Sequence, residues 1–157
     1  MISVRKGSSD DLTLLAEFNK RLIEDEKSDN PMDTAQLRDR MKGFLETDYD
    51  AYLFGFEGNE IGYALVKTSC SPLYLRQFFI DRPYRRRHFG EQAFRRLLET
   101  LNTDRIDVEV LVWNEPAVGF WRKMGFEVRS LYMRRETRDG TPSGTARESA
   151  SGKTVAL

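Results

Sequence analysis

The sequence predicts one domain of the mixed α/β class (α+β), in which a mostly antiparallel, twisted sheet of about six to seven strands is flanked by about four helices. Two observations support this prediction. Segments with apolar residues three or four positions apart are interspersed with segments in which apolar and polar residues alternate, and these are the periods of helices and strands. The chain also has 157 residues, 39% of them hydrophobic, which suits one core.

The N-terminal part is predicted to contain one strand and two helices. The short strand covers 2–5, and Ser8 or Ser9 caps the first helix. The second helix begins at Asp33 or Thr34. Two helices therefore precede the main sheet.

The central part is predicted to form three strands, at 51–56, 61–67 and 74–80. The first two strands flank 57–60, whose sequence Glu-Gly-Asn-Glu indicates a hairpin turn. A basic turn at 81–90 follows the third strand and leads into a helix.

The C-terminal part is predicted to add a strand, a short helix and a last strand. Apolar and polar residues alternate over 105–113, which is typical of a strand with two different faces. Asn114 opens the short helix and Gly125 caps its end. The last strand is expected at 126–134.

Composition changes near residue 136 and divides the chain into a domain at 1–135 and a tail at 136–157. Gly, Ser, Thr and charged residues dominate the tail, which is too poor in apolar residues to offset the entropy of ordering. We expect the tail to be disordered.

Charge and cysteine content narrow the class of protein. Lys plus Arg and Asp plus Glu number 25 each, so no overall field draws the chain to nucleic acid or to a membrane. Cys70, the single cysteine, cannot form an internal disulfide. With no signal peptide and no apolar stretch that could span a bilayer, we expect a cytoplasmic protein with no metal site.

The turn at 81–90 contains three consecutive arginines, Arg85, Arg86 and Arg87. The first turn of a helix presents free backbone N–H groups and about half a positive charge from the helix dipole. Gly90 lets the backbone come close to an anion because it has no side chain. We therefore expect a phosphate-binding turn, and the alternative is a solvated charged surface.

Two segments resemble the signatures of the GNAT superfamily of N-acetyltransferases. Residues 75–90 are similar to its acetyl-CoA signature, in which a strand precedes a Q/RxxGxG/A turn. Residues 114–126 are similar to its second signature, NxxAxxFYxxxGF, and the matching positions are Asn114, Ala117, Phe120, Trp121, Gly125 and Phe126. The order of elements over 2–132 also fits, so the resemblance covers nearly everything except the tail.

The resemblance implies a GNAT fold with acetyl-CoA as the acyl donor, in a splay between the strands at 74–80 and 105–113. It also implies that the main chain of Phe78, Phe79 and Ile80 pairs with the pantetheine arm and polarises the thioester carbonyl. The full set of implied cofactor-binding residues is Phe78, Phe79, Ile80, Arg85, Arg86, Arg87, His88, Phe89, Gly90, Glu91, Asn114, Phe120 and Trp121.

Two positions depart from the family pattern. His88 replaces the first glycine of the turn, and we expect a phosphate contact or a solvent-facing side chain there rather than catalysis. Trp121 stands where many members have a tyrosine thought to protonate the leaving thiolate. An indole cannot act as that acid, so packing is the expected role of Trp121.

An amine acceptor arrives protonated, because an alkylamine has a pKa of about 10, and it must lose that proton before it attacks. The family often places a carboxylate or histidine near the start of the strand before the turn, where this chain has Tyr74 and Arg76. The candidate catalytic residues are therefore Glu109, as the carboxylate, and Tyr74, in a water-mediated relay. The alternative for Glu109 is a solvated strand residue.

The segment at 24–32 corresponds to the part of GNAT proteins that often builds the acceptor pocket. Glu24 and Glu26 there would favour a cationic acceptor, whereas Arg76 would favour one that carries a carboxylate. The alternative for the acidic run formed by Glu24, Asp25 and Glu26 is a solvated helix end.

The predicted function is transfer of an acetyl group from acetyl-CoA to a primary amine of a small molecule, by direct attack in a ternary complex. The acceptor would be amino-acid-like, polyamine-like or aminoglycoside-like. The alternatives are a non-catalytic acyl-CoA sensor, or a protein N-terminal or lysine acetyltransferase. A homodimer remains open.

Overall fold

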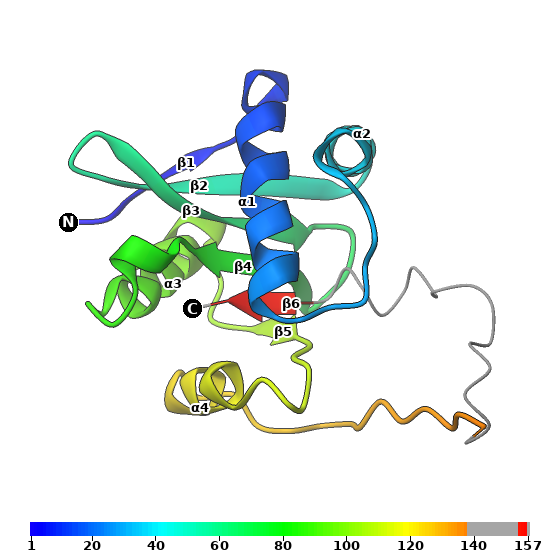
Figure 1. The fold of residues 1–157 in the computed structure, drawn as a ribbon. Coiled ribbons are helices and arrows are strands. Elements are labelled where there is room, and N and C mark those ends of the chain that lie inside the picture. The colour runs from blue at the N-terminus through cyan, green and yellow to red at the C-terminus, as the bar shows by residue number, and fades with distance from the viewer. Residues whose placement is uncertain (138–153, 157) are drawn as a thin grey trace.

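The computed structural model describes residues 1–137 and 154–156, which form one sheet with helices on both of its faces (Figure 1). In chain order the elements are β1 (Ser3–Lys6), the 3-10 turn η1 (Ser9–Asp11), α1 (Leu12–Asp25), α2 (Thr34–Leu45), β2 (Tyr49–Phe56), β3 (Asn59–Lys67), β4 (Leu73–Ile80), the 3-10 turn η2 (Arg82–Tyr84), α3 (Phe89–Leu101), β5 (Ile106–Val108), α4 (Glu115–Lys123) and β6 (Thr154–Ala156).

The sheet follows the order β1-β2-β3-β4-β5, and β6 pairs with β4 beside β5. Neighbouring strands from β1 to β4 are antiparallel. β4 and β5 are parallel, and all three residues of β5 pair with Leu73–Leu75, after which the chain leaves the edge of β4 toward α4 (Figure 1). The predicted fold class is confirmed. At the place of the predicted splay, β5 ends at Val108 and leaves the rest of this β4 edge to β6.

Alternation along the central strands builds two apolar layers. One layer lies between the sheet and helices α1 and α2, and it includes Leu53 and Phe79. The other lies between the sheet and helices α3 and α4, and it includes Phe54 and Phe78. Adjacent residues of one strand thus anchor opposite helical layers, which fixes the strand register.

The β2–β3 hairpin forms where the sequence predicted it. Its two-residue turn has left-handed backbone at Glu57 and Gly58, with φ of 49° and 80°. Further along β3, Gly62 pairs with Ile80, and a Cβ at Gly62 would lie 2.0 Å from the carbonyl oxygen of Phe79. Glycine therefore lets β3 and β4 approach closely at the end of β4.

Two strands predicted for the C-terminal part require correction. The strand predicted at 105–113 is formed only at Ile106–Val108, and the strand predicted at 126–134 is absent. Both segments have alternating patterns, but among the described residues no strand pairs with the outer edge of β5. Without a partner the backbone gains no ladder hydrogen bonds, and Leu131 and Met133 remain exposed.

The tail was expected to be disordered throughout 136–157. Residues 154–156 instead form β6 and pair with Gln77, Phe78 and Phe79 of β4. Low apolar content argues against a buried core segment, but a strand at a sheet edge gains main-chain hydrogen bonds that do not depend on composition. Residues 138–153 lie outside the described part of the chain.

Candidate active site

The loop between β4 and α3 has an unusual backbone. Arg86 and His88 both adopt left-handed conformations, with φ of 59° and 61°, which non-glycine residues seldom do. His88 is the N-cap of α3, and its side chain caps none of the helix N–H groups. Strained backbone next to a helix start with uncapped N–H groups is the arrangement that binds anions.

His88 keeps the backbone shape that the family pattern obtains from glycine. Its left-handed φ is the conformation that glycine adopts without strain. The imidazole is exposed, as expected for a side chain that faces solvent. At this φ a histidine costs about 1 kcal/mol of strain that a glycine would not.

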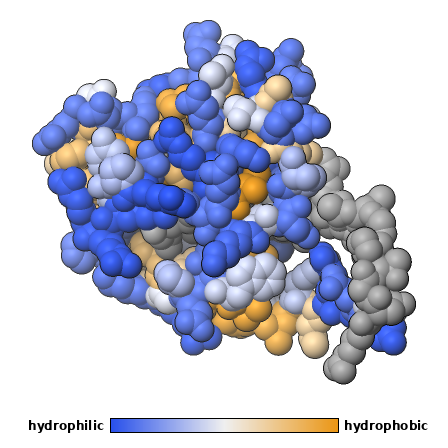
Figure 2. Space-filling model, in the orientation of Figure 1, coloured by the Kyte–Doolittle hydropathy of each residue, from blue (hydrophilic) through white to orange (hydrophobic). Residues whose placement is uncertain are grey.

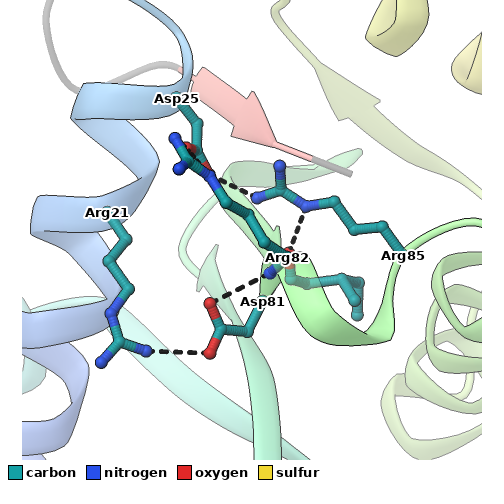
Figure 3. Close-up of polar contacts among 6 residues, drawn as sticks. Arg21, Asp25, Asp81, Arg82 and Arg85 are labelled. Atoms are coloured by element: carbon teal, nitrogen blue, oxygen red, sulfur yellow. Dashed lines mark hydrogen bonds and ion pairs between the residues drawn. The ribbon is translucent and has the colours of Figure 1, made fainter.

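Two loop arginines are held by the end of helix α1 (Figure 3). The Asp25 carboxylate pairs with Arg82 through one oxygen and with Arg85 through the other. Arg85 Nε also donates to the carbonyl oxygen of Ile80, at 2.7 Å. Only 5% of the Asp25 side chain and 18% of the Arg85 side chain are exposed, so this ion pair is largely shielded from water, whereas 70% of the Arg82 side chain is exposed. The two ion pairs fasten the loop to α1.

A second ion pair joins the same two elements. Arg21 on α1 donates to Asp81 at 2.9 Å, and Asp81 also accepts from the backbone N–H of Arg82 (Figure 3). Sequence reasoning treated Asp25 as part of a solvated or acceptor-binding run and missed this role. Its spacing from Arg21 along one helix face was the available signal.

The other residues of the loop and of the first turn of α3 differ in their exposure to solvent. Arg86 and Arg87 are exposed, and the Arg87 guanidinium lies 4.8 Å from the centre of the Phe89 ring. Phe89 is buried. The Glu91 carboxylate binds Lys123 and Arg95, and these two partners lower its pKa. Opposite charges thus surround the one carboxylate in the first turn of α3.

Residues of the second predicted signature build helix α4 and its contact with β4. Asn114 caps the helix by accepting from the Ala117 N–H at 3.4 Å. The Trp121 ring packs edge-on against Phe78, and Phe120 stacks on Phe78. Trp121 is 2% exposed and its Nε1 has no hydrogen-bond partner among the described residues. Trp121 therefore packs in the core under β4.

The two candidate catalytic residues lie next to each other. Tyr74 pairs in register with Asp107 of β5, and Glu109 follows directly after the end of β5, close enough to Tyr74 to influence its pKa. Burial raises the pKa of the Tyr74 hydroxyl well above its usual value, and the nearby Glu109 carboxylate raises it further. The Tyr74 hydroxyl is therefore protonated at pH 7. Glu109 is exposed to solvent.

The three candidate acceptor residues lie in different surroundings. Glu26 is buried, with 4% of its surface exposed, and lies close enough to Tyr63 to influence its pKa. Arg76 donates to the Tyr49 hydroxyl at 3.3 Å and lies over the Phe44 ring. Glu24, by contrast, is exposed.

A buried polar cluster that sequence reasoning missed lies on the same face of the sheet. The Tyr63 hydroxyl donates to Gln77 Oε1 at 2.7 Å, and Arg40 donates to Asn19 at 3.1 Å. Burial raises the pKa of Tyr63, with opposite smaller effects from Arg40 and Glu26. A glutamine within the apolar strand at 73–80 was the signal for this cluster.

No helix in 1–137 is both long and apolar enough to cross a bilayer. Within the described part of the chain, no three His, Cys, Asp or Glu side chains gather in a way that could hold a metal ion.

Solved structures share this fold at low sequence identity. A predicted acetyltransferase with acetyl-CoA from Clostridium acetobutylicum has a TM-score of 0.64 at 16% identity, covering 87% of this chain and 96% of that one. The aminoglycoside acetyltransferase AAC(6')-Iy, in complex with a bisubstrate analogue, has a TM-score of 0.64 at 19% identity, covering 87% and 99%. Glucosamine-6-phosphate N-acetyltransferase from Arabidopsis thaliana has a TM-score of 0.57 at 14% identity, covering 87% and 98%.

At such identities these structures establish the fold alone. No curated protein matches the sequence significantly. Residues 14–126, however, match the model of the acetyltransferase (GNAT) family, and this range includes the loop, α3 and α4. The match confirms the predicted family and the predicted acyltransferase class. By its fold and by this match, the chain belongs to the acetyltransferase (GNAT) family.

Proposed function

We propose that this protein transfers an acetyl group from acetyl-CoA to a primary amine of a small molecule, by direct attack in a ternary complex. The observation that carries the proposal is the position of the anion-binding loop. It lies directly at the end of β4, on the edge where β4 and β5 separate. A nucleotide pyrophosphate at the loop would direct the donor's pantetheine arm along that edge.

The loop has the chemistry to hold the donor. The first N–H groups of α3 have no acceptor within the helix, and the helix dipole favours a negative charge there. Arg86 and Arg87 are exposed beside them and supply guanidinium donors. Phe120 and Trp121 position β4 from below through Phe78, so these aromatic residues support the donor site by packing.

Bound acetyl-CoA supplies an acyl group activated as a thioester. The backbone of Phe78, Phe79 and Ile80 would orient the arm by main-chain hydrogen bonds. An N–H fixed in the sheet and directed at the carbonyl oxygen stabilises the negative charge that develops there when the amine attacks. Because the sheet already fixes this N–H, little reorganisation is needed during the reaction.

The amine's proton passes to Glu109. A neutral Tyr74 cannot accept that proton at pH 7, but its hydroxyl can orient the amine or an intervening water toward the carboxylate. Trp121 cannot protonate the leaving thiolate, so that proton comes from water or from another hydroxyl. Glu109 is thus the general base and Tyr74 its positioning partner.

The acceptor is a small molecule that carries an amine and at least one further polar group. Glu26 and Arg76 lie on the α1–α2 face of the sheet and offer charges of both signs. Two of the similar structures are described as an aminoglycoside acetyltransferase and a glucosamine-6-phosphate acetyltransferase, and their names favour an amino-sugar-like or amino-acid-like acceptor.

Thiol release from acetyl-CoA tests the proposal. The full-length protein is incubated with acetyl-CoA and a panel of amino sugars, aminoglycosides, polyamines and amino acids, and free thiol is measured against an enzyme-free control. Release with one amine class supports the proposal and identifies the acceptor. Acetyl-CoA binding without release for any amine or for lysine-containing peptides favours the sensor alternative.

The exposed apolar surface supports self-association. Hydrophobic side chains gather at the lower edge of the face in Figure 2, in the region of β5, α4 and the segments flanking α4. Val112, Trp113, Leu131 and Met133 are among the exposed ones. We propose a homodimer through this surface, and the molar mass in solution, measured by light scattering, tests it.

A further inference from the structure

Two strands share one edge of β4. β3 occupies the opposite edge along most of the strand. On the shared edge, β5 pairs with Leu73 to Leu75, and β6 pairs with Gln77 to Phe79. The C-terminal strand therefore fills the length of edge that β5 leaves when it separates from β4 (Figure 1).

That length of edge is the one assigned above to the pantetheine arm, through the main chain of Phe78 to Ile80. A strand and an arm that lie in the same groove beside β4 exclude each other sterically, since neighbouring chains in a sheet lie about 4.8 Å apart. We infer that Thr154–Ala156 and the donor's pantetheine arm occupy this edge in turn, so that the chain's own C-terminus competes with the acyl donor. The inference rests on the proposed function.

The surroundings of β6 agree with a donor site closed by the protein itself. β6 lies against α1 as well as β4, beside the helix end that carries Asp25 (Figure 3). In the same structure Asp25 holds the guanidinium groups of Arg82 and Arg85. In this structure the β4 edge proposed for the donor pairs with β6, and Arg82 and Arg85 pair with Asp25.

The length of β6 makes it displaceable. It has three residues, at the short end of the range for strands, and pairs with one neighbour only. A longer arm with additional contacts at the pyrophosphate loop can replace such a strand. The apparent dissociation constant rises by the inverse of the fraction of molecules whose edge is open, so a strand in place about nine tenths of the time weakens donor binding about tenfold.

The alternative role for β6 is to cover an exposed sheet edge, and the two roles predict different behaviour. Calorimetry with acetyl-CoA compares the wild-type chain, a chain lacking Thr154–Leu157, and the full-length variants Val155→Pro and Ala156→Pro. Successive N–H groups of a strand point to opposite sides, so only one of the two prolines removes a donor to β4, and the other is its matched control.

Competition predicts that the deletion and one proline variant bind acetyl-CoA several-fold more tightly than wild type, while the other proline variant stays close to wild type. Hydrogen exchange on the wild-type chain provides a second readout: the amides of Thr154–Ala156 exchange faster once acetyl-CoA is added. Equal affinities in all four proteins, with β6 amides still protected in the complex, would overturn the inference. No binding by any of the four would instead refute the proposed function.

Discussion

Glu109 follows directly after β5, close enough to Tyr74 to influence its pKa, and burial keeps the Tyr74 hydroxyl protonated. With Glu109 as the base, Glu109→Gln lowers kcat for the amine acceptor by about 100-fold or more, because general-base catalysis contributes that much. Acetyl-CoA affinity stays unchanged, since the proposal places the donor's pyrophosphate at the loop between β4 and α3, here called the donor loop, and gives Glu109 no part in holding it. Thiol release and calorimetry measure the two quantities.

Asp107→Asn is the matched control for this prediction. Asp107 is exposed, lies two residues before Glu109 and pairs in register with Tyr74. Loss of activity in Asp107→Asn with full activity in Glu109→Gln would transfer the role of base to Asp107.

Tyr63 makes the free energy of unfolding depend on pH in the alkaline range. Burial raises the pKa of Tyr63 in the folded state, whereas the unfolded chain ionises it near its ordinary value of about 10. The folded state therefore binds more protons above pH 10, and the free energy of unfolding falls there by about 1.4 kcal/mol per pH unit for this group. Below pH 10 Tyr63 contributes no slope.

Tyr63→Phe reduces this slope between pH 10 and pH 11.5, although Tyr74, whose pKa is also raised, keeps part of it. Urea unfolding at several pH values measures the slope, and Tyr132→Phe, at an exposed position, serves as control. The same slope in Tyr63→Phe and in wild type would show that Tyr63 ionises in the folded protein.

At the scale of elements, the end of α1 fastens the donor loop through Asp25. Asp25→Asn removes the charge that both Arg82 and Arg85 contact, and we expect it to lower the free energy of unfolding by about 2 kcal/mol. Glu24→Gln changes the neighbouring carboxylate, which is exposed, and leaves stability unchanged. Urea denaturation compares the two variants, and equal stabilities would mean that the Asp25 ion pairs do not hold the loop.

The close approach of β3 and β4 depends on Gly62. A Cβ there would lie 2.0 Å from the Phe79 carbonyl oxygen, so Gly62→Ala forces the strands apart at the donor end of β4 and costs about 1–3 kcal/mol. Gly43→Ala on α2, where a Cβ meets nothing within 4 Å, instead stabilises the protein by up to about 1 kcal/mol. Thermal unfolding of both variants decides whether the contact controls stability, and a neutral Gly62→Ala would contradict it.

For the whole molecule, local patterns predicted most of the fold. The four helices, the β2–β3 hairpin and β4 were predictable because each has a strong period, cap or turn of its own. The missing strand at 126–134 and the added β6 were not, because strand formation there depends on which edge is available. Which strands pair is decided in the assembled sheet, and the sequence of one segment alone does not reveal its partner.

Contacts between residues far apart in the chain were harder to predict than contacts within one turn. Arg85 and Gly90 lie in a contiguous turn, so sequence spacing brings them together. Asp25, by contrast, meets Arg85 only through the tertiary fold, 60 positions apart in the chain. Tyr63 and Gln77 likewise meet across two strands, 14 positions apart.

Calorimetric titration of acetyl-CoA into the wild-type protein and into Gly90→Glu tests the central claim most directly. Gly90 lies in the first turn of α3, where a glutamate suits the helix and its dipole but repels a pyrophosphate. We predict micromolar binding by wild type and binding weakened at least about tenfold in a well-folded Gly90→Glu. Equal affinity in the two proteins would contradict a donor site at the start of α3.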